Sequence, residues 1–268
     1  MEKLRITLVQ SKLMWEDVAN NLAHFTRLLK EVKKSSTDLI VLPEMFTTGF
    51  SMNAALYAQD KNGTAMEWMQ QMAVQKNAVV CGTLMFAEHE KFYNRFIWMR
   101  PDGTYEFYNK RHLFSLGKED HTYTRGTGKL IVELKGFKIC PLVCYDLRFP
   151  VWSKNKATIE NGNIIADYDM LLYVANWPKR RRTAWKQLLI ARAIENVSFV
   201  VGLNRVGKDA HGFEHTGDSA VLDFIGNKIL NVKPLKQSIS SITLTKRDLQ
   251  KFRNDFQVLA DGDTFSVK

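Results

Sequence analysis

Residues 137–150 read FKICPLVCYDLRFP, and the character of the sequence changes within this stretch at Cys144. The preceding residues 137–143 are mostly apolar and predict a short buried strand. A side chain directly after such a strand is held rigidly and is exposed, and backbone N–H groups of the next turn are free to bind an oxyanion. The stretch therefore predicts an α/β protein with a nucleophilic thiol at a strand end. A plain core cysteine is the alternative, which Cys81 and Cys140 fit because they lie inside apolar strands.

Strand and helix patterns alternate on both sides of this stretch. Strand patterns cover residues 4–10, 38–42, 78–86, 94–100, 104–108, 168–175, 199–203, 219–223 and 239–245. Helical apolar spacing covers residues 16–34, 64–76 and 181–195, and a short basic helix begins near Lys246. This mixed order predicts α/β layers. The sequence contains no linker, low-complexity tract or internal repeat, so we expect a single domain over residues 1–268.

Two further residues suit the chemistry of a reactive thiol. Glu44 follows a predicted buried strand and a proline in DLIVLPE, where a carboxylate is costly unless it has a partner or a task. Lys110 follows a predicted strand in FYNKRHLF. A carboxylate with a raised pKa serves as base for a thiol, whereas a lysine lowers the thiol pKa and stabilises an oxyanion. A salt-bridged strand end for Glu44 and a solvated Lys110 are the alternatives.

Five segments together resemble a known family. LPEMFTTGF, YNKRHLF and CYDLRFP resemble, in this order, the three motif regions of the nitrilase superfamily of carbon–nitrogen hydrolases. YVANWP and LLIARAIENVSFVVGLNRVG extend the resemblance, which runs from the first predicted strand to about Asp223. The match is most similar to the omega-amidase branch, which hydrolyses the terminal amide of 2-oxo acid amides such as 2-oxoglutaramate.

The resemblance implies a role for each matching residue. Glu44 falls on the general base of the family, Lys110 on its lysine and Cys144 on its nucleophile. Glu119, in GKEDHTYTRG, falls near a second glutamate that many members have, with a loop acid without a role as the alternative. The resemblance also implies a four-layer α-β-β-α sandwich that pairs with a second copy into a homodimer. We expect the backbone N–H of Tyr145 to bind the oxyanion together with Lys110.

The expected reaction is acyl transfer through a thioester on Cys144, which needs no metal and no organic cofactor. The sequence shows no zinc-ligand spacing, phosphate loop or dinucleotide fingerprint. A carboxylate on the substrate needs a cation, and a planar arginine fork is the better partner. The candidate substrate-binding residues are the cations Arg148, Lys179 and Arg180 and the aromatic residues Phe46, Tyr145 and Trp177. A structural pair of Arg148 with Asp146, a solvated helix start at 179–182 and core packing of the rings are the alternatives.

The composition is that of an ordinary globular protein, and the net charge bears on what the protein binds. Hydrophobic residues make up 45% and charged residues 25% of the chain, as in ordinary globular proteins. The net charge of +10 and the run at 179–182 raise the question of nucleic-acid binding. The basic residues are spread along the chain without a nucleic-acid-binding signature, so we expect them to attract a small anionic amide substrate instead.

The sequence also indicates a compartment. The start MEKLRITLVQ has too few apolar residues for a secretory signal, and no apolar run reaches the length of a membrane span. Three cysteines form no even disulfide framework, so we expect a cytoplasmic protein.

We therefore expect an amidohydrolase that converts a small 2-oxo acid amide to the acid and ammonia. A nitrilase, a carbamoylase or an aliphatic amidase with the same catalytic set is one alternative. A basic binding protein in which Cys144 is inert is another.

Overall fold

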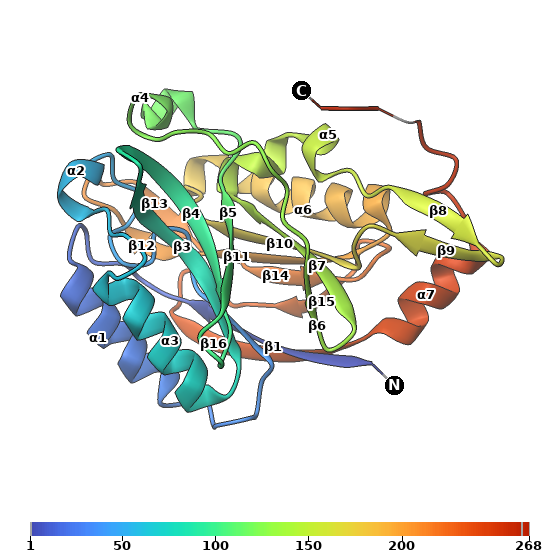
Figure 1. Cartoon of the computed structure of the whole chain (residues 1–268), viewed down its shortest axis with the longest axis horizontal. Coiled ribbons are helices and arrows are strands. Elements are labelled where there is room, and N and C mark those ends of the chain that lie inside the picture. The colour runs from blue at the N-terminus through green and yellow to red at the C-terminus, as the bar shows by residue number, and fades with distance from the viewer. Residues whose placement is uncertain (1, 264, 268) are drawn as a thin grey trace.

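Two six-stranded sheets form the centre of the computed structural model, which describes residues 2–263 and 265–267 (Figure 1). The first sheet has the order β16-β1-β2-β3-β4-β5, with β1 Lys3–Gln10, β2 Leu39–Val41, β3 Val79–Glu88, β4 Lys91–Met99, β5 Tyr105–Asn109 and β16 Ser238–Thr245. The second sheet has the order β15-β14-β11-β10-β7-β6, with β6 Val132–Leu134, β7 Phe137–Val143, β10 Met170–Ala175, β11 Phe199–Asn204, β14 Ala220–Leu222 and β15 Lys228–Asn231.

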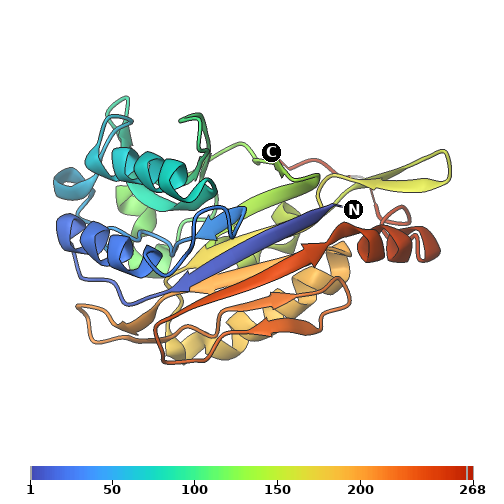
Figure 2. The same ribbon diagram turned by 90° about the horizontal axis from the view of Figure 1, so that it is seen from below.

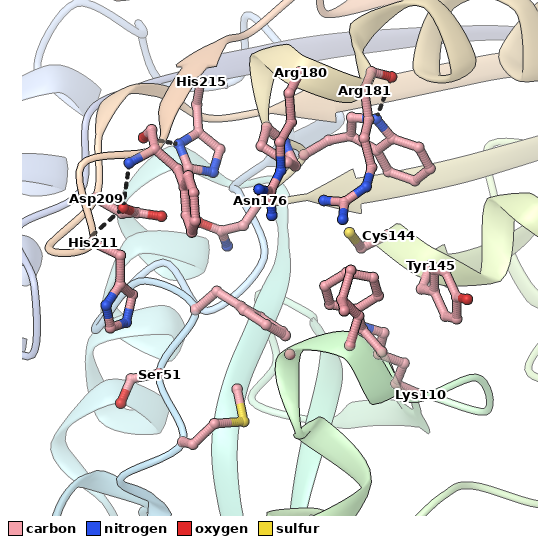
Figure 3. A pocket seen from close by; sticks show the side chains of 18 of the residues that line it. Ser51, Lys110, Cys144, Tyr145, Asn176, Arg180, Arg181, Asp209, His211 and His215 are labelled. Atoms are coloured by element: carbon pink, nitrogen blue, oxygen red, sulfur yellow. Dashed lines mark hydrogen bonds between the residues drawn. The ribbon is translucent and has the colours of Figure 1, made fainter.

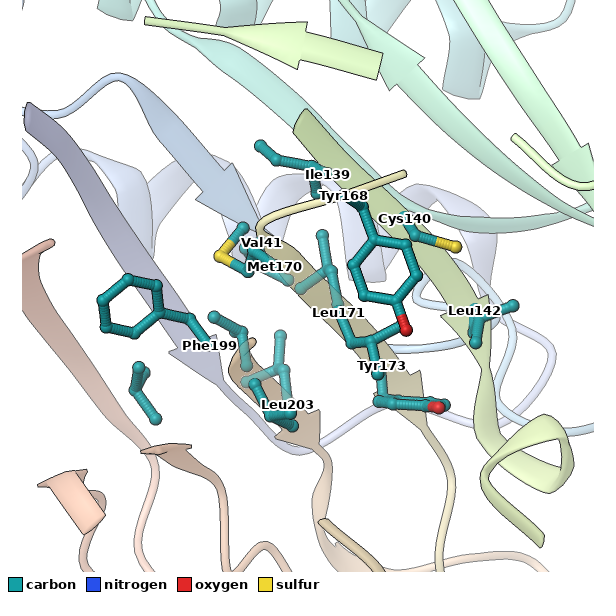
Figure 4. Close-up of a cluster of buried hydrophobic side chains, with 14 of the residues drawn as sticks. Val41, Ile139, Cys140, Leu142, Tyr168, Met170, Leu171, Tyr173, Phe199 and Leu203 are labelled. Atoms are coloured by element: carbon teal, nitrogen blue, oxygen red, sulfur yellow. The ribbon is translucent and has the colours of Figure 1, made fainter. Parts of the chain in front are cut away.

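The two-residue period of the strands explains how the sheets pack. Ile6 and Leu8 of β1 lie in one core with side chains of β7, β10 and β11, whereas Val9 packs in a second core with the first helices. Val41 of β2 likewise lies among labelled side chains of the second sheet, such as Met170 (Figure 4). The sheets therefore pack face to face, and the opposite face of each is left for helices.

Helices α1 (Val18–Leu29) and α3 (Thr64–Lys76) cover the first sheet, and α6 (Arg182–Asn196) lies on the far side of the second sheet (Figure 2). The side chain of Asp17 accepts a hydrogen bond from the N–H of Asn20 and caps α1. Gly202 in β11 allows α6 to approach, since a Cβ there would lie 2.6 Å from a methyl carbon of Leu189. The result is the predicted four-layer α-β-β-α sandwich.

Shorter elements connect these layers. They are α2 Ala54–Tyr57, α4 Glu119–Thr122, α5 Pro150–Ser153 and α7 Lys246–Asp255, the hairpin strands β8 Ala157–Glu160, β9 Asn163–Ala166, β12 Val206–Lys208 and β13 Glu214–Thr216, and the 3₁₀ turns Ser115–Gly117, Cys144–Arg148 and Lys179–Arg181. No helix in the described part of the chain is long and apolar enough to cross a membrane.

The predicted long elements are confirmed with small shifts of their ends. The predicted helix 64–76 coincides with α3, and the predicted helix 16–34 is shorter, at Val18–Leu29. The hairpins β8–β9 and β12–β13 and the short strands β6 and β15 were not predicted. They are three or four residues long, which is too short to show a clear apolar periodicity.

The parallel strands determine where chemistry can gather. β1, β2 and β3 run parallel, and so do β7, β10 and β11. Glu44 follows the end of β2, Cys144 that of β7 and Asn176 that of β10. The carboxyl ends of parallel strands meet at one edge of a sheet, where α/β proteins bind their ligands.

Candidate active site

Lys110 lies between two buried carboxylates at this edge. Its Nζ is 2.9 Å from Oε1 of Glu44 and 2.9 Å from Oε2 of Glu119, and all three side chains are fully buried. Burial alone lowers the pKa of Lys110, but the charges of Glu119 and Glu44 outweigh it, and the pKa is raised. Burial raises the pKa of Glu119, and the nearby Glu44 adds to this effect against the opposing influence of Lys110. The ammonium group therefore stays charged between two carboxylates.

Further hydrogen bonds hold the two carboxylates in place. Nδ2 of Asn94, on β4, donates to Oε1 of Glu44 at 2.8 Å and to Oε1 of Glu119 at 2.9 Å. The backbone N–H of Asn176 donates to Oε2 of Glu44 at 2.7 Å, and that of Phe114 donates to Oε2 of Glu119 at 2.6 Å. A buried ionic cluster is stable only when its remaining lone pairs are satisfied, and these donors satisfy them.

Cys144 begins the turn Cys144–Arg148 in an unusual backbone conformation. Its φ of 45° lies in the left-handed region, which costs a residue with a side chain about 1–2 kcal/mol. Such strain is retained where a side chain must be presented in one direction. Burial and the charge of Glu44 raise the pKa of the thiol, with Lys110 opposing them, and a hydrogen bond with Glu44 raises it further. These influences favour the neutral form of the thiol.

A cavity of about 570 Å³ opens above Cys144 (Figure 3). Its walls include the aromatic residues Trp15, Phe50, Phe114, Tyr145, Trp177 and Phe213, the cations Lys110, Arg148, Arg180 and Arg181, and the residues Asn176, Asp209, His211 and His215. The rings of Tyr145 and Phe114 meet edge to face at 5.1 Å between centroids. A cavity of this size, in which aromatic rings surround converging polar and charged groups, is typical of a site for a small molecule.

Three arginines give the cavity a positive charge. The guanidinium of Arg148 lies 5.0 Å from the ring of Trp177, that of Arg180 4.2 Å from Phe213 and that of Arg181 5.1 Å from Phe114. None of these guanidinium groups forms an ion pair with a carboxylate in the part of the chain that the structure describes. Burial lowers the pKa of Arg181, and the charges of Arg180 and Arg148 lower it further. Figure 3 shows the side chain of Arg181 directed towards Cys144.

The structure places two of the predicted substrate-binding residues away from this cavity. Phe46 is fully buried in the core under the helices, with its ring 5.5 Å from that of Phe25 and 5.7 Å from that of Trp68. Lys179 is on the surface and forms an ion pair with Glu214 at 2.7 Å. Both predictions are corrected: Phe46 is a core residue, and the charge of Lys179 is already paired.

Arg148, Arg180, Tyr145 and Trp177 line the cavity. The alternative pairing of Arg148 with Asp146 is not formed, because the Asp146 carboxylate accepts from His112 and Tyr108 instead.

Sequence reasoning missed Asn94, Asn176 and Arg181. The two asparagines lie in a strand interior and in a loop, where the sequence alone offers no sign of their carboxylate partners. Arg181 is one of four consecutive basic residues, and only the fold separates them: Lys179 and Arg182 pair with carboxylates, while Arg180 and Arg181 face the cavity. The described residues include no cluster of three or more His, Cys, Asp or Glu side chains that could hold a metal ion.

Residues 5–254 match the carbon-nitrogen hydrolase family. This chain belongs to that family. The omega-amidase YafV of Escherichia coli K12 is 43% identical to this carbon–nitrogen hydrolase, and the match covers 100% of both chains. The 2-oxoglutaramate amidase of Bacillus subtilis is 34% identical over 72% of this chain and 73% of its own. The resemblance found in the sequence is thus confirmed.

Solved structures agree with this assignment. A CN-hydrolase superfamily protein of Xanthomonas campestris, solved with an arsenic adduct in its active site, is 40% identical to this hydrolase, with a TM-score of 0.95 and 100% of both chains covered. Nit3 of Saccharomyces cerevisiae, a member of the nitrilase superfamily, shares the fold with a TM-score of 0.80 at 22% identity. The predicted nitrilase-type sandwich is confirmed, and the chain is an amidohydrolase of the carbon–nitrogen hydrolase family.

Proposed function

We propose that this hydrolase is an omega-amidase that converts a small 2-oxo acid amide, such as 2-oxoglutaramate, to the acid and ammonia. The observation that carries the proposal is the set of three arginines in the cavity at Cys144 that form no ion pair with a carboxylate of the described residues. A substrate with a carboxylate at one end would compensate part of this charge, whereas a neutral nitrile or amide would leave it uncompensated. The names of the relatives from Escherichia coli and Bacillus subtilis support the same substrate class.

In the proposed cycle Glu44 takes the thiol proton as the sulfur of Cys144 attacks the amide carbon. The oxyanion lies between Lys110 and the backbone N–H of Tyr145. Glu44 then protonates the leaving nitrogen, so ammonia departs and a thioester remains. Water, oriented by Glu44 and Glu119, adds to the thioester, which releases the acid and restores the thiol.

The electrostatics of the site support this division of roles. A thiol in its neutral form requires a base beside it, and the carboxylate of Glu44 is near enough to raise the pKa of the Cys144 thiol. The raised pKa of Lys110 keeps that residue a permanent cation, which suits an oxyanion donor rather than a proton carrier. Tyr145 is the second residue of a 3₁₀ turn, and the first N–H groups of a helical turn have no acceptor within it.

The position of the arginines relative to Cys144 supports selection by length. A bidentate arginine–carboxylate pair has a fixed geometry, so it fixes the distance from the carboxylate to the amide carbon. Arg181 is directed towards Cys144 (Figure 3). Arg148 ends the turn that Cys144 begins. The ring of Trp177 contacts the guanidinium of Arg148, and the ring of Phe114 contacts that of Arg181.

An ammonia-release assay tests the proposal. Purified protein should release ammonia from 2-oxoglutaramate with a higher kcat/KM than from glutamine, asparagine or a simple nitrile. A preference for a nitrile or a carbamoyl amino acid would assign the protein to another branch of the family. Equal rates for acidic and neutral amides would show that the arginines do not select the substrate.

We further propose that the chain is a single catalytic domain that acts in the cytoplasm as a homodimer and does not bind nucleic acid. Three free cysteines support a reducing compartment. The basic run at 179–182 is divided between ion pairs and the cavity, which argues against a continuous nucleic-acid surface. Light scattering at micromolar concentration tests the dimer, and a monomer mass would reject it.

A further inference from the structure

Asp146 is a fully buried carboxylate two residues after the proposed nucleophile. Its Oδ1 accepts from the backbone N–H of His112 at 3.0 Å and from Nδ1 of the same residue at 2.8 Å. Its Oδ2 accepts from the hydroxyl of Tyr108 at 2.8 Å and from the backbone N–H of Val143 at 3.0 Å. Because a carboxylate only accepts, the His112 ring must carry its proton on Nδ1.

These donors come from the two segments that carry Lys110 and Cys144. Tyr108 and His112 stand two residues before and after Lys110, at the end of β5 in the first sheet. Val143 directly precedes Cys144, at the end of β7 in the second sheet. One carboxylate therefore ties the edges of both sheets together beside the site.

Packing around this carboxylate restricts both segments further. The His112 ring stacks on Phe149 with 3.8 Å between centroids and 7° between planes. The Tyr108 hydroxyl also accepts from the indole N–H of Trp152 at 3.0 Å and from the backbone N–H of Arg111 at 3.1 Å. The hydrogen bonds and the stacked rings leave little freedom for either segment to move alone.

We propose that Asp146 is a positioning residue that fixes Lys110 relative to Cys144 across the junction of the two sheets. The inference rests on the roles given to Lys110 and Cys144 in the proposed function. The hydrogen bond that Asp146 accepts from the backbone N–H of Val143 also holds the chain where Cys144 adopts its left-handed backbone conformation. The four donors require a carboxylate, because an asparagine would turn an N–H₂ group towards donors and leave them unpaired.

The direct test compares Asp146→Asn with the wild type in two assays. We expect kcat for 2-oxoglutaramate to fall about 10²-fold, the loss typical when reacting groups are displaced by about 1 Å. KM should change little, because the arginines of the cavity are untouched. Alkylation of Cys144 by iodoacetamide, measured on its own peptide by mass spectrometry, should become slower as Lys110 moves away from the thiol.

Asp169→Asn is the matched control. Asp169 is also a buried carboxylate, paired with Arg253 at 2.8 Å and bonded to the backbone N–H of Lys138 at the start of β7. We expect this variant to lose stability but to keep the kcat and the alkylation rate of the wild type. A folded Asp146→Asn variant with wild-type kcat, or equal losses of kcat in both variants, would overturn the inference.

A second pair of variants covers the case in which Asp146→Asn does not fold. His112→Asn keeps a side-chain N–H donor for Asp146 and should retain most of kcat, whereas His112→Leu should lose it. Equal activity of the two variants would also overturn the inference. If the wild type does not hydrolyse 2-oxoglutaramate, the proposed function fails, and the alkylation assay still tests the positioning role by itself.

Discussion

The ammonium nitrogen of Lys110 lies 2.9 Å from Oε1 of Glu44, although 66 positions separate the two residues along the chain. Each follows a strand of the same sheet, β5 and β2 respectively, and the pair is fully buried together with Glu119. Removal of one member of this set leaves the other buried charges unpaired, so we expect its loss to affect folding as well as the proposed catalysis.

Lys110→Met should therefore affect both properties. We expect kcat to fall by about 10²–10³ through loss of an oxyanion donor. We also expect the free energy of unfolding to fall by about 3–5 kcal/mol, because two buried carboxylates lose their partner. Steady-state kinetics and urea unfolding measure the two effects. Lys179→Met, at an exposed ion pair, is the control and should change neither; a loss of only a few-fold in Lys110→Met would contradict the role of that lysine.

Cys144→Ala and Cys144→Ser should abolish ammonia release while the protein remains folded. Alkylation should inactivate the wild type, and substrate should protect it. Cys140→Ala, in the strand β7 that leads to Cys144, is the matched control and should retain turnover, because the Cys140 side chain is buried in the core and is not among the residues that line the cavity. Normal turnover in Cys144→Ala would reject the thioester mechanism.

Arg181→Met and Arg148→Met should separate the substrate anchor from structural arginines. Loss of a charge-assisted pair costs about 1.5–3 kcal/mol, so kcat/KM for 2-oxoglutaramate should fall roughly ten- to a hundred-fold. The value for a neutral short amide should change far less. Arg182→Met serves as control, since Arg182 is paired with Asp218. If kcat/KM falls equally for both substrates in a variant, the substituted arginine has a structural role, and Arg180 becomes the candidate anchor.

His215 should make stability depend on pH. Burial and the charge of Arg205 lower the pKa of His215 from 6.5 to about 4. Between these values the unfolded chain binds a proton that the native histidine does not bind, so the free energy of unfolding falls as the pH is lowered through this range.

The measurement is urea unfolding of the wild type and His215→Gln at about pH 7.5 and about pH 4.5. Between the two conditions, the free energy of unfolding of the wild type should fall by about 2–3 kcal/mol more than that of the variant. All other titratable groups contribute equally to the pH dependence of both proteins, so the difference between them isolates His215. Equal losses would mean that His215 titrates as a solvated histidine.

Local patterns were sufficient for much of the architecture. The alternation in β1, the helical spacing over 64–76 and the apolar run before Cys144 each report which side chains are buried, and burial depends on the period of the element itself. Glu44, Lys110 and Cys144 were predicted by their place after strands and by motifs that resemble one family.

The amino-acid sequence by itself thus determined the mixed order of strands and helices and, through motifs that resemble one family, the family and its layered fold, and it predicted Glu44, Lys110 and Cys144 for the site. Only the tertiary structure decided which charges are paired. Among residues 179–182 it turned Lys179 and Arg182 towards carboxylates of the β12–β13 region and left Arg180 and Arg181 facing the cavity. It also placed Phe46 in the core. The physical reason is that a charge or a ring acquires its role from partners far away in the chain, and no local period records those contacts.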